Sequence, residues 1–122
     1  MEDYDEDAIS CKVVLLGEAG VGKREIIVRF MGYTTEEMME MSSSHSYKTV
    51  TFKEYGGKRI KFGIWEIAGT EKYRSLAKIF YKDADVAILV YDITRKGSFE
   101  DLQNYWIEEI RQNARKNISK LK

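Results

Sequence analysis

The chain has 122 residues, of which 43% are hydrophobic and 33% charged, and this is enough for one globular domain with its own core. Basic and acidic side chains balance to a formal net charge of zero, so bulk charge gives no argument for binding nucleic acid or an anionic membrane. The single cysteine, Cys11, excludes an internal disulfide. Because the sequence has neither a signal-peptide pattern nor a membrane-spanning apolar run, we expect a cytoplasmic protein.

Composition divides the chain into two parts. Residues 1–9 hold five acidic side chains among the first seven positions and predict a disordered, solvated tip. Residues 10–122 predict a single domain. Its first element is a buried strand over Ser10–Leu16, because that run is short, apolar and β-branched.

A glycine-rich stretch, Gly17–Arg24, follows this strand and reads G-E-A-G-V-G-K-R. It leads into a helix predicted over residues 23–32, and this order of strand, loop and helix is what a phosphate-binding loop requires. Glycines let successive backbone N–H groups point at one anion, and the helix N-terminus adds positive partial charge. Lys23 adds a full positive charge for the outer phosphates. The residues predicted to form this nucleotide-phosphate site are Glu18, Ala19, Gly20, Val21, Gly22, Lys23 and Arg24.

The middle of the chain predicts a β-hairpin after a loop. Residues 33–46 keep no sustained period and predict a mobile surface loop. Tyr47–Tyr55 alternates polar and apolar residues, Gly56-Gly57 is a turn signal, and Lys58–Ile67 is the return strand.

The second half predicts two helices around a strand. Apolar spacing favours a helix over Glu71–Tyr81 and a buried strand over Ala84–Tyr91. A further helix runs from an N-cap at Ser98 to Asn113, with an apolar stripe formed by Leu102, Tyr105, Trp106 and Ile110. The basic, polar tail from Ala114 holds no further strong strand.

The element order β-α-β-β-α-β-α predicts an α/β layered sheet. Ligands of such sheets lie at the C-terminal ends of the strands. Gly17–Arg24 and Glu66–Gly69 both fall at predicted strand ends, so we expect these two loops to converge on one edge of the sheet.

Five stretches carry a family likeness in their order and spacing. With them the chain resembles a Ras-superfamily small GTPase, and within that superfamily the Rab branch. A phosphate loop alone would also fit an unrelated phosphate-loop protein, but the other four runs would then be coincidence. The stretches are G-E-A-G-V-G-K-R (17–24), I-W-E-I-A-G-T-E-K-Y-R-S-L (64–76), F-Y-K-D-A-D (80–85), L-V-Y-D-I-T (89–94) and S-F-E-D-L (98–102).

The resemblance implies a fold, ligands and a switch. The fold would be that of a P-loop NTPase with a Ras-like layered sheet, in which Tyr47–Tyr55 is one antiparallel edge strand. The ligands would be guanine nucleotide, as GTP or GDP, and Mg²⁺. Gly69, the glycine of the family's D-x-x-G motif, would join the nucleotide contacts. The loops around 33–46 and 66–78 would close on the γ-phosphate and relax after hydrolysis, as in a membrane-trafficking switch.

The residues around the implied Mg²⁺ depart from the family pattern. Arg24 replaces the hydroxyl that ligates the metal, and a guanidinium cannot ligate a cation but would neutralise a phosphate oxygen. Glu66 replaces the aspartate of D-x-x-G and keeps the carboxylate. A gapless count from Lys23 places Ser42 at the family's switch threonine. Ser42 and Glu66 are therefore the implied metal-site residues, in a site that Arg24 disturbs.

Hydrolysis is expected to be slow. Thr70 stands where the family has the catalytic glutamine that orients the attacking water, and a threonine hydroxyl is too short to act in the same way.

The family continues past Asn113 into a strand bearing N-K-x-D, a second base-binding loop and a closing helix. We therefore expect a sheet truncated before its fifth strand, with weak and poorly base-selective nucleotide binding. Ala84–Tyr91 would be an exposed sheet edge and apolar surface beside the first strand would be uncovered, which favours a dimer through that edge. The C-terminal residues carry no cysteine for a lipid anchor.

Tyr47, Trp65 and Phe80 match positions that form an exposed aromatic cluster in Rab proteins, where effector or regulator proteins contact it. Ordinary core packing explains the same residues equally well.

Three functions stay open on the sequence. The first is a Rab-type GTPase that binds guanine nucleotide and hydrolyses it slowly. The second is a pseudo-GTPase that keeps the fold as an interaction module for a trafficking partner. The third is a truncated fragment without activity of its own.

Overall fold

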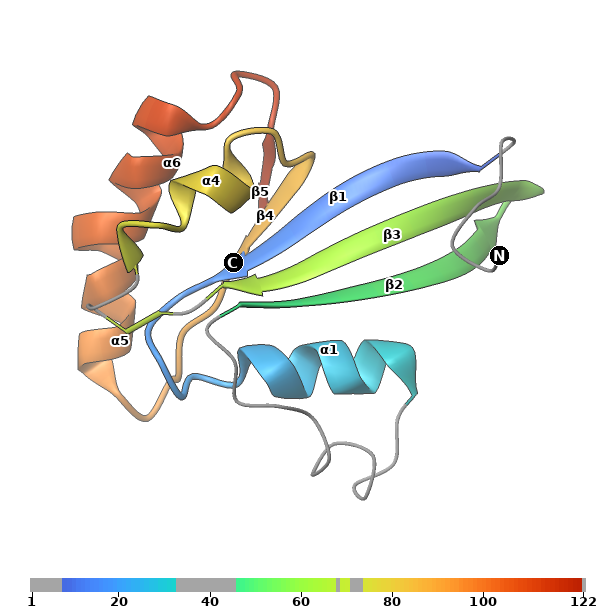
Figure 1. Ribbon diagram of the computed structural model, residues 1–122. Helices are drawn as coiled ribbons and strands as arrows, with labels where there is room; N and C mark the ends of the chain where they lie inside the picture. Colours follow the sequence, from blue (N-terminus) through green and yellow to red (C-terminus); the bar gives the residue numbers. More distant parts are fainter. Residues whose placement is uncertain (1–7, 33–45, 68, 71–73, 122) are drawn as a thin grey trace.

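The computed structural model describes residues 8–32, 46–67, 69–70 and 74–121 as a five-stranded sheet with helices on both faces (Figure 1). For residues 46–48 and 121 it describes the backbone alone. The elements, in chain order, are β1 (Ile9–Leu16), α1 (Lys23–Met31), β2 (Ser46–Tyr55), β3 (Lys58–Ile67), α4 (Lys78–Tyr81), β4 (Val86–Leu89), α5 (Lys96–Asp101), η1 (Leu102–Trp106), α6 (Ile107–Asn113) and β5 (Ser119–Leu121).

β1 is the central strand of a sheet whose order is β2-β3-β1-β4-β5. It pairs in parallel with β3 on one side and with β4 on the other, while β2 pairs antiparallel with β3.

The predicted antiparallel edge strand is thus confirmed as β2, and the return strand, β3, has the predicted bounds. The predicted first strand is confirmed as well, but it begins at Ile9, inside the segment predicted as a tip; residues 1–7 of that tip lie outside the described residues.

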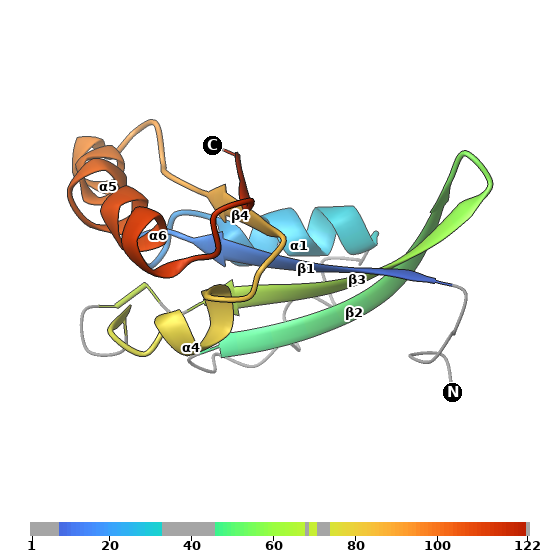
Figure 2. The ribbon, with the colours of Figure 1, turned by 90° about the horizontal axis from the view of Figure 1, so that it is seen from above.

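The two faces of β1 pack against different helices, which gives the layers seen in Figure 2. Val14 and Leu16 join a cluster with α4 and with the long helix α5–η1–α6. Val13 and Leu15 point the other way and pack with Ile27 of α1. Alternation along a strand has period two, so one apolar run serves both layers. The predicted α/β layered sheet is therefore confirmed.

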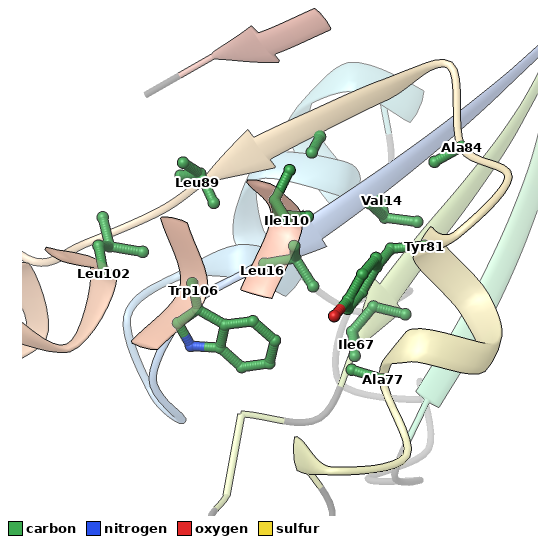
Figure 3. Packing of buried hydrophobic residues seen from close by; sticks show 11 residues of the cluster. Val14, Leu16, Ile67, Ala77, Tyr81, Ala84, Leu89, Leu102, Trp106 and Ile110 are labelled. Carbon is green, nitrogen blue, oxygen red and sulfur yellow. The ribbon is translucent and has the colours of Figure 1, made fainter. Parts of the chain in front are cut away.

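The long helix covers residues 96–113 and contains one π-helical turn, η1. Leu102, Trp106 and Ile110 recur at intervals of four and are fully buried, as the predicted apolar stripe requires. Figure 3 shows these side chains gathered with Leu16 and Tyr81 in one core.

The N-cap predicted at Ser98 is wrong. The helix begins at Lys96, and Arg95 is its N-cap. The Ser98 hydroxyl accepts the backbone N–H of Asp92 at 2.9 Å and donates to the carbonyl of Arg95 at 2.7 Å. Ser98 thus ties the helix to the turn before it instead of capping its own downstream N–H groups.

The helix predicted over Glu71–Tyr81 is also shorter than expected. In the structure α4 has four residues, residues 75–77 before it form turns, Arg74 is helical, and residues 71–73 lie outside the described part. Of the apolar residues at helical spacing, Ala77 is buried, whereas Leu76 is 52% exposed. Apolar spacing alone therefore overestimated this helix.

A fifth strand is present, so the predicted truncation of the sheet before that strand is wrong. β5 pairs in parallel with β4, which covers the strand edge that the sequence predicted to be exposed. Arg115 forms an ion pair with Asp85, and the Ser119 N–H donates to the Asp85 carbonyl at 3.0 Å. These long-range contacts hold a polar, basic run that has no strand pattern of its own. The edge left for the predicted dimer is β5, not β4.

An apolar groove of about 270 Å³ is open between α1 and strands β1 and β4. Cys11 lines it half-buried, and Ile26 and Phe30 of α1 are 43% and 37% exposed beside it. The predicted uncovered apolar surface next to the first strand is therefore confirmed. None of the helices in the described part of the chain has the length and apolar character that crossing a membrane needs.

Trp106→Ala is expected to cost about 3–5 kcal/mol of unfolding free energy, because it empties the centre of the core around a fully buried ring. Gln103→Ala, at an exposed position of the same helix, is the matched control and should stay within about 0.5 kcal/mol of the parent. Urea unfolding of the two variants measures the difference. Equal losses in both would contradict this description of the core.

Candidate functional site

The loop after β1 is shaped by contact with the neighbouring strand. Gly17 has a φ of +151°, and a Cβ there would collide with the carbonyl oxygen of Val90. The N–H of Val90 donates to the carbonyl of Leu16 at 2.8 Å, which extends the β1–β4 pairing up to this point. A side chain at position 17 would therefore break the junction between the strand and the loop.

Lys23 turns its ammonium group into the loop. Its Nζ donates to the carbonyls of Gly17 at 2.7 Å and Glu18 at 3.1 Å, and the residue is only 5% exposed. Burial lowers the pKa of Lys23 to about 8, although the carboxylate of Glu66 acts in the opposite direction. The loop therefore encloses a basic group at the N-terminus of α1, where an anion is favoured.

Arg24 and Glu66 form an ion pair. Glu66 lies next to Leu15 in the register of β3 on β1, beside the strand that leads into the loop. The Nε of Arg24, in the first turn of α1, donates to Oε1 of Glu66 at 2.9 Å. The side chains are only 20% and 18% exposed. Two of the three positions that the sequence connected with Mg²⁺ thus contact each other.

Gly69 lies directly against the loop. A Cβ at this residue would collide with the carbonyl oxygen of Gly17 and would come within 2.8 Å of the backbone N of Ala19. Thr70 follows it and is exposed. Together with Glu18, Ala19, Gly69 and Thr70, the side chains of Arg74 and Asp101 line a cavity of about 490 Å³. The predicted convergence of the two loops at one edge of the sheet is therefore confirmed.

Arg74 is a site residue that the sequence reasoning missed. Its guanidinium donates to both carboxylate oxygens of Asp101, at 2.9 and 3.0 Å, and to the carbonyl of Gly69 at 3.0 Å. It also lies over the rings of Tyr105 and Trp106, at 4.4 and 5.3 Å from their centroids. Arg74 thus fixes the segment after β3 to the long helix.

Arg95 is the second residue that the sequence did not single out. Its Nη2 donates to the carbonyl of Ala19 at 3.0 Å and lies 3.7 Å from a carboxylate oxygen of Glu18. The turn between β4 and α5 therefore supports the glycine-rich loop from outside. Neither Arg74 nor Arg95 had a local signal, because the contacts of Arg74 with Asp101 and of Arg95 with Ala19 join residues distant in sequence.

The described residues do not fit a magnesium site. Mg²⁺ prefers oxygen ligands in octahedral geometry. Glu66 is engaged by the cationic Arg24 at 2.9 Å. Ser42, the other predicted metal-site residue, and the loop that carries it lie outside the described residues.

The predicted effector surface is partly described. Trp65 and Phe80 lie 5.0 Å apart between ring centroids, half-buried against the core, and the ammonium of Lys12 is 5.7 Å from the Trp65 ring. The side chain of Tyr47 lies outside the described part. The pair packs against the core and is also partly exposed to solvent, which agrees with core packing and with an effector surface alike.

Gly69→Ala is expected to destabilise the fold by about 1–3 kcal/mol, because the methyl group must displace backbone of the glycine-rich loop. Gly97→Ala is the matched control: nothing lies within 4 Å of the added Cβ, and helix propensity should stabilise this variant by up to about 1 kcal/mol. Thermal unfolding separates the two cases. A Gly69→Ala protein as stable as the parent would contradict the close approach of the loops.

The lowered pKa of Lys23 makes stability depend on pH. Between pH 8 and 10.5 the unfolded chain keeps a proton that folded Lys23 has released, so the unfolding free energy should rise with pH in this window. Lys23→Met removes that contribution. Urea unfolding across the window should therefore show a steeper rise for the parent than for Lys23→Met, and parallel curves would contradict the buried ammonium.

The sequence matches known proteins over nearly its whole length. The sequence model of the Ras family covers residues 12–121. GTP-binding protein YPT53 of Saccharomyces cerevisiae is 39% identical over 110 residues, which are 90% of this chain and 49% of that protein. Ras-related protein Rab-22A of Homo sapiens is 40% identical over 107 residues, or 88% and 54%. Ras-related protein RAB1BV of Beta vulgaris is 36% identical over 121 residues, or 98% and 53%.

The chain spans about half the length of these curated relatives. The matched region includes the glycine-rich loop and the whole of β3 and β5. The sheet order and the loop geometry agree with the Ras-like α/β fold of P-loop proteins. The resemblance predicted from the motifs is therefore confirmed, and the chain belongs to the Ras family, with Rab proteins among its relatives.

Proposed function

We propose that this chain binds the phosphates of a guanine nucleotide, GTP or GDP, as a Rab-like domain of a membrane-trafficking switch. The observation that carries the proposal is the ammonium of Lys23, enclosed by the glycine-rich loop at the N-terminus of α1. In this proposal a phosphate takes over the hydrogen bonds that the carbonyls of Gly17 and Glu18 now accept. The remaining contacts come from backbone N–H groups of residues 18–24 and of Gly69.

We propose further that hydrolysis is slow. Thr70 borders the cavity beside Glu18 and Ala19, where the attacking water would have to be held. A threonine side chain reaches less far than a glutamine and offers one hydroxyl instead of an amide. Since positioning supplies much of the catalysis in phosphoryl transfer, a shorter side chain at this point supports a domain that holds nucleotide longer than it turns it over.

An interaction module without turnover, a pseudo-GTPase, is the second candidate. The half-buried pair of Trp65 and Phe80, next to the ammonium of Lys12, supports it. Effector or regulator proteins would contact this pair together with Tyr47, in the manner of the aromatic cluster expected from the sequence. Nucleotide binding without measurable hydrolysis favours this candidate over the first one.

Calorimetric titration of the purified chain with GDP, GTP and ADP tests the binding proposal. GDP and GTP should bind, and Lys23→Met should weaken both by at least about tenfold, because one charged contact to phosphate is lost. ADP measures base selectivity. The Gly97→Ala chain is the control for protein preparation, since nothing lies within 4 Å of a Cβ added at position 97. Absence of binding for both guanine nucleotides would refute the proposal.

Thr70→Gln is expected to speed hydrolysis of bound GTP on the order of tenfold, equivalent to about 1.4 kcal/mol of barrier. Thr70 is exposed, so the change should leave stability intact. Ser75→Gln, also exposed and outside the cavity lining, is the matched control. Single-turnover phosphate release gives the rates. An unchanged rate in Thr70→Gln would mean that water positioning at this residue does not limit the reaction.

A further inference from the structure

Two departures from the family sequence meet in one contact. Arg24 stands where the family likeness has a hydroxyl on the metal, and Glu66 stands where it has an aspartate that holds a metal-bound water. In the structure the guanidinium Nε and the carboxylate Oε1 of these residues are 2.9 Å apart. The two residues, one on helix α1 and the other on strand β3, are 42 positions apart in the chain.

The contact is incompatible with a divalent cation at the same place. A cation that used Glu66 would have to displace Arg24 or lie beside a positive guanidinium. With side-chain exposures of 20% and 18%, both charges are largely out of water, and a cation that displaced Arg24 would separate its guanidinium from this carboxylate. Removing one member of a poorly solvated pair costs more than the pair itself contributes. The geometry therefore favours the ion pair over a metal.

We propose that the Arg24–Glu66 ion pair takes the place of Mg²⁺, so that this site binds nucleotide phosphates without a divalent cation. The inference rests on the proposed nucleotide binding and concerns the cofactor requirement of the same site. Arg24 brings one positive charge to the first turn of α1, directly after Lys23, and Glu66 fixes the direction of that charge. Arginine stays charged at physiological pH and suits phosphate oxygens geometrically.

The charge balance also bears on affinity. Lys23, Arg24 and Glu66 together carry one net positive charge, whereas Lys23, Glu66 and a divalent cation would carry two. Binding is therefore weaker than a metal-supported site would give, but it is insensitive to chelators. Insensitivity to chelators is the property that separates this inference from nucleotide binding in general.

The experiment compares GDP binding by the full chain in excess Mg²⁺ and in EDTA, using calorimetry, with inorganic pyrophosphate as a second probe of the phosphate site. The parent should bind each probe equally well in both solutions. The double variant Arg24→Ser/Glu66→Asp restores a hydroxyl and a shorter carboxylate. It should bind GDP at least about tenfold more tightly in Mg²⁺ than in EDTA.

The pair of Arg111 and Glu108 provides the matched control, because it has the same 2.9 Å separation on the exposed surface of α6. Arg111→Ser/Glu108→Asp should bind like the parent in both solutions. Circular dichroism checks that each variant is folded, and the comparison of the parent in Mg²⁺ and EDTA needs no variant at all.

The outcomes separate the two proposals. If the parent binds GDP more tightly in Mg²⁺ than in EDTA, the substitution of the metal by the ion pair is refuted while nucleotide binding stands. If the parent binds neither probe in either solution, both proposals fail. If a folded double variant stays insensitive to Mg²⁺, the ion pair is not what excludes the cation.

Discussion

The parallel pairing of β1 with both β3 and β4 is the constraint on which the site depends. It aligns Leu15 with Glu66 and Leu16 with Leu89, so three loops leave the sheet at one edge within a few residues of each other. The close packing of Gly17 against Val90 and of Gly69 against Gly17 follows from that register. Had β3 shifted by one residue, every side chain at its end would face the opposite layer. The site is thus fixed by backbone pairing before any side chain contributes.

Charged side chains then hold the three loops in place. Arg74 connects the segment after β3 to Asp101 on the long helix, and Arg95 connects the turn after β4 to Ala19. Both arginines donate to carbonyl or carboxylate oxygens of the scaffold, although the buried Nε of Arg74 has no hydrogen-bond partner in the described part of the chain. Movement of the segment near Gly69 away from the long helix therefore requires Arg74 to separate from Asp101.

The parts of this fold that follow from local pattern could be predicted from the sequence. The return strand has its predicted bounds, and the apolar stripe through Leu102, Trp106 and Ile110 is buried as expected. β5 could not be predicted, because a polar run there depends on β4 and Asp85 for its strand geometry. Serine is a residue type that favours the N-cap position, but the hydroxyl of Ser98 accepts the backbone N–H of Asp92 instead. In each failure a contact across the chain outweighed the local preference.

The site residues also show that a contact between distant residues is not predicted from the local sequence. The sequence presented Arg24 and Glu66 as two separate defects in a metal site, one severe and one mild. In space they are one interaction, in which the longer carboxylate reaches the guanidinium at 2.9 Å. Glutamate in place of aspartate at position 66 thus has a structural role beside Arg24, because the shorter aspartate side chain would reach less far toward the guanidinium. This coupling could not be predicted from single positions, because the two residues are 42 positions apart in the chain.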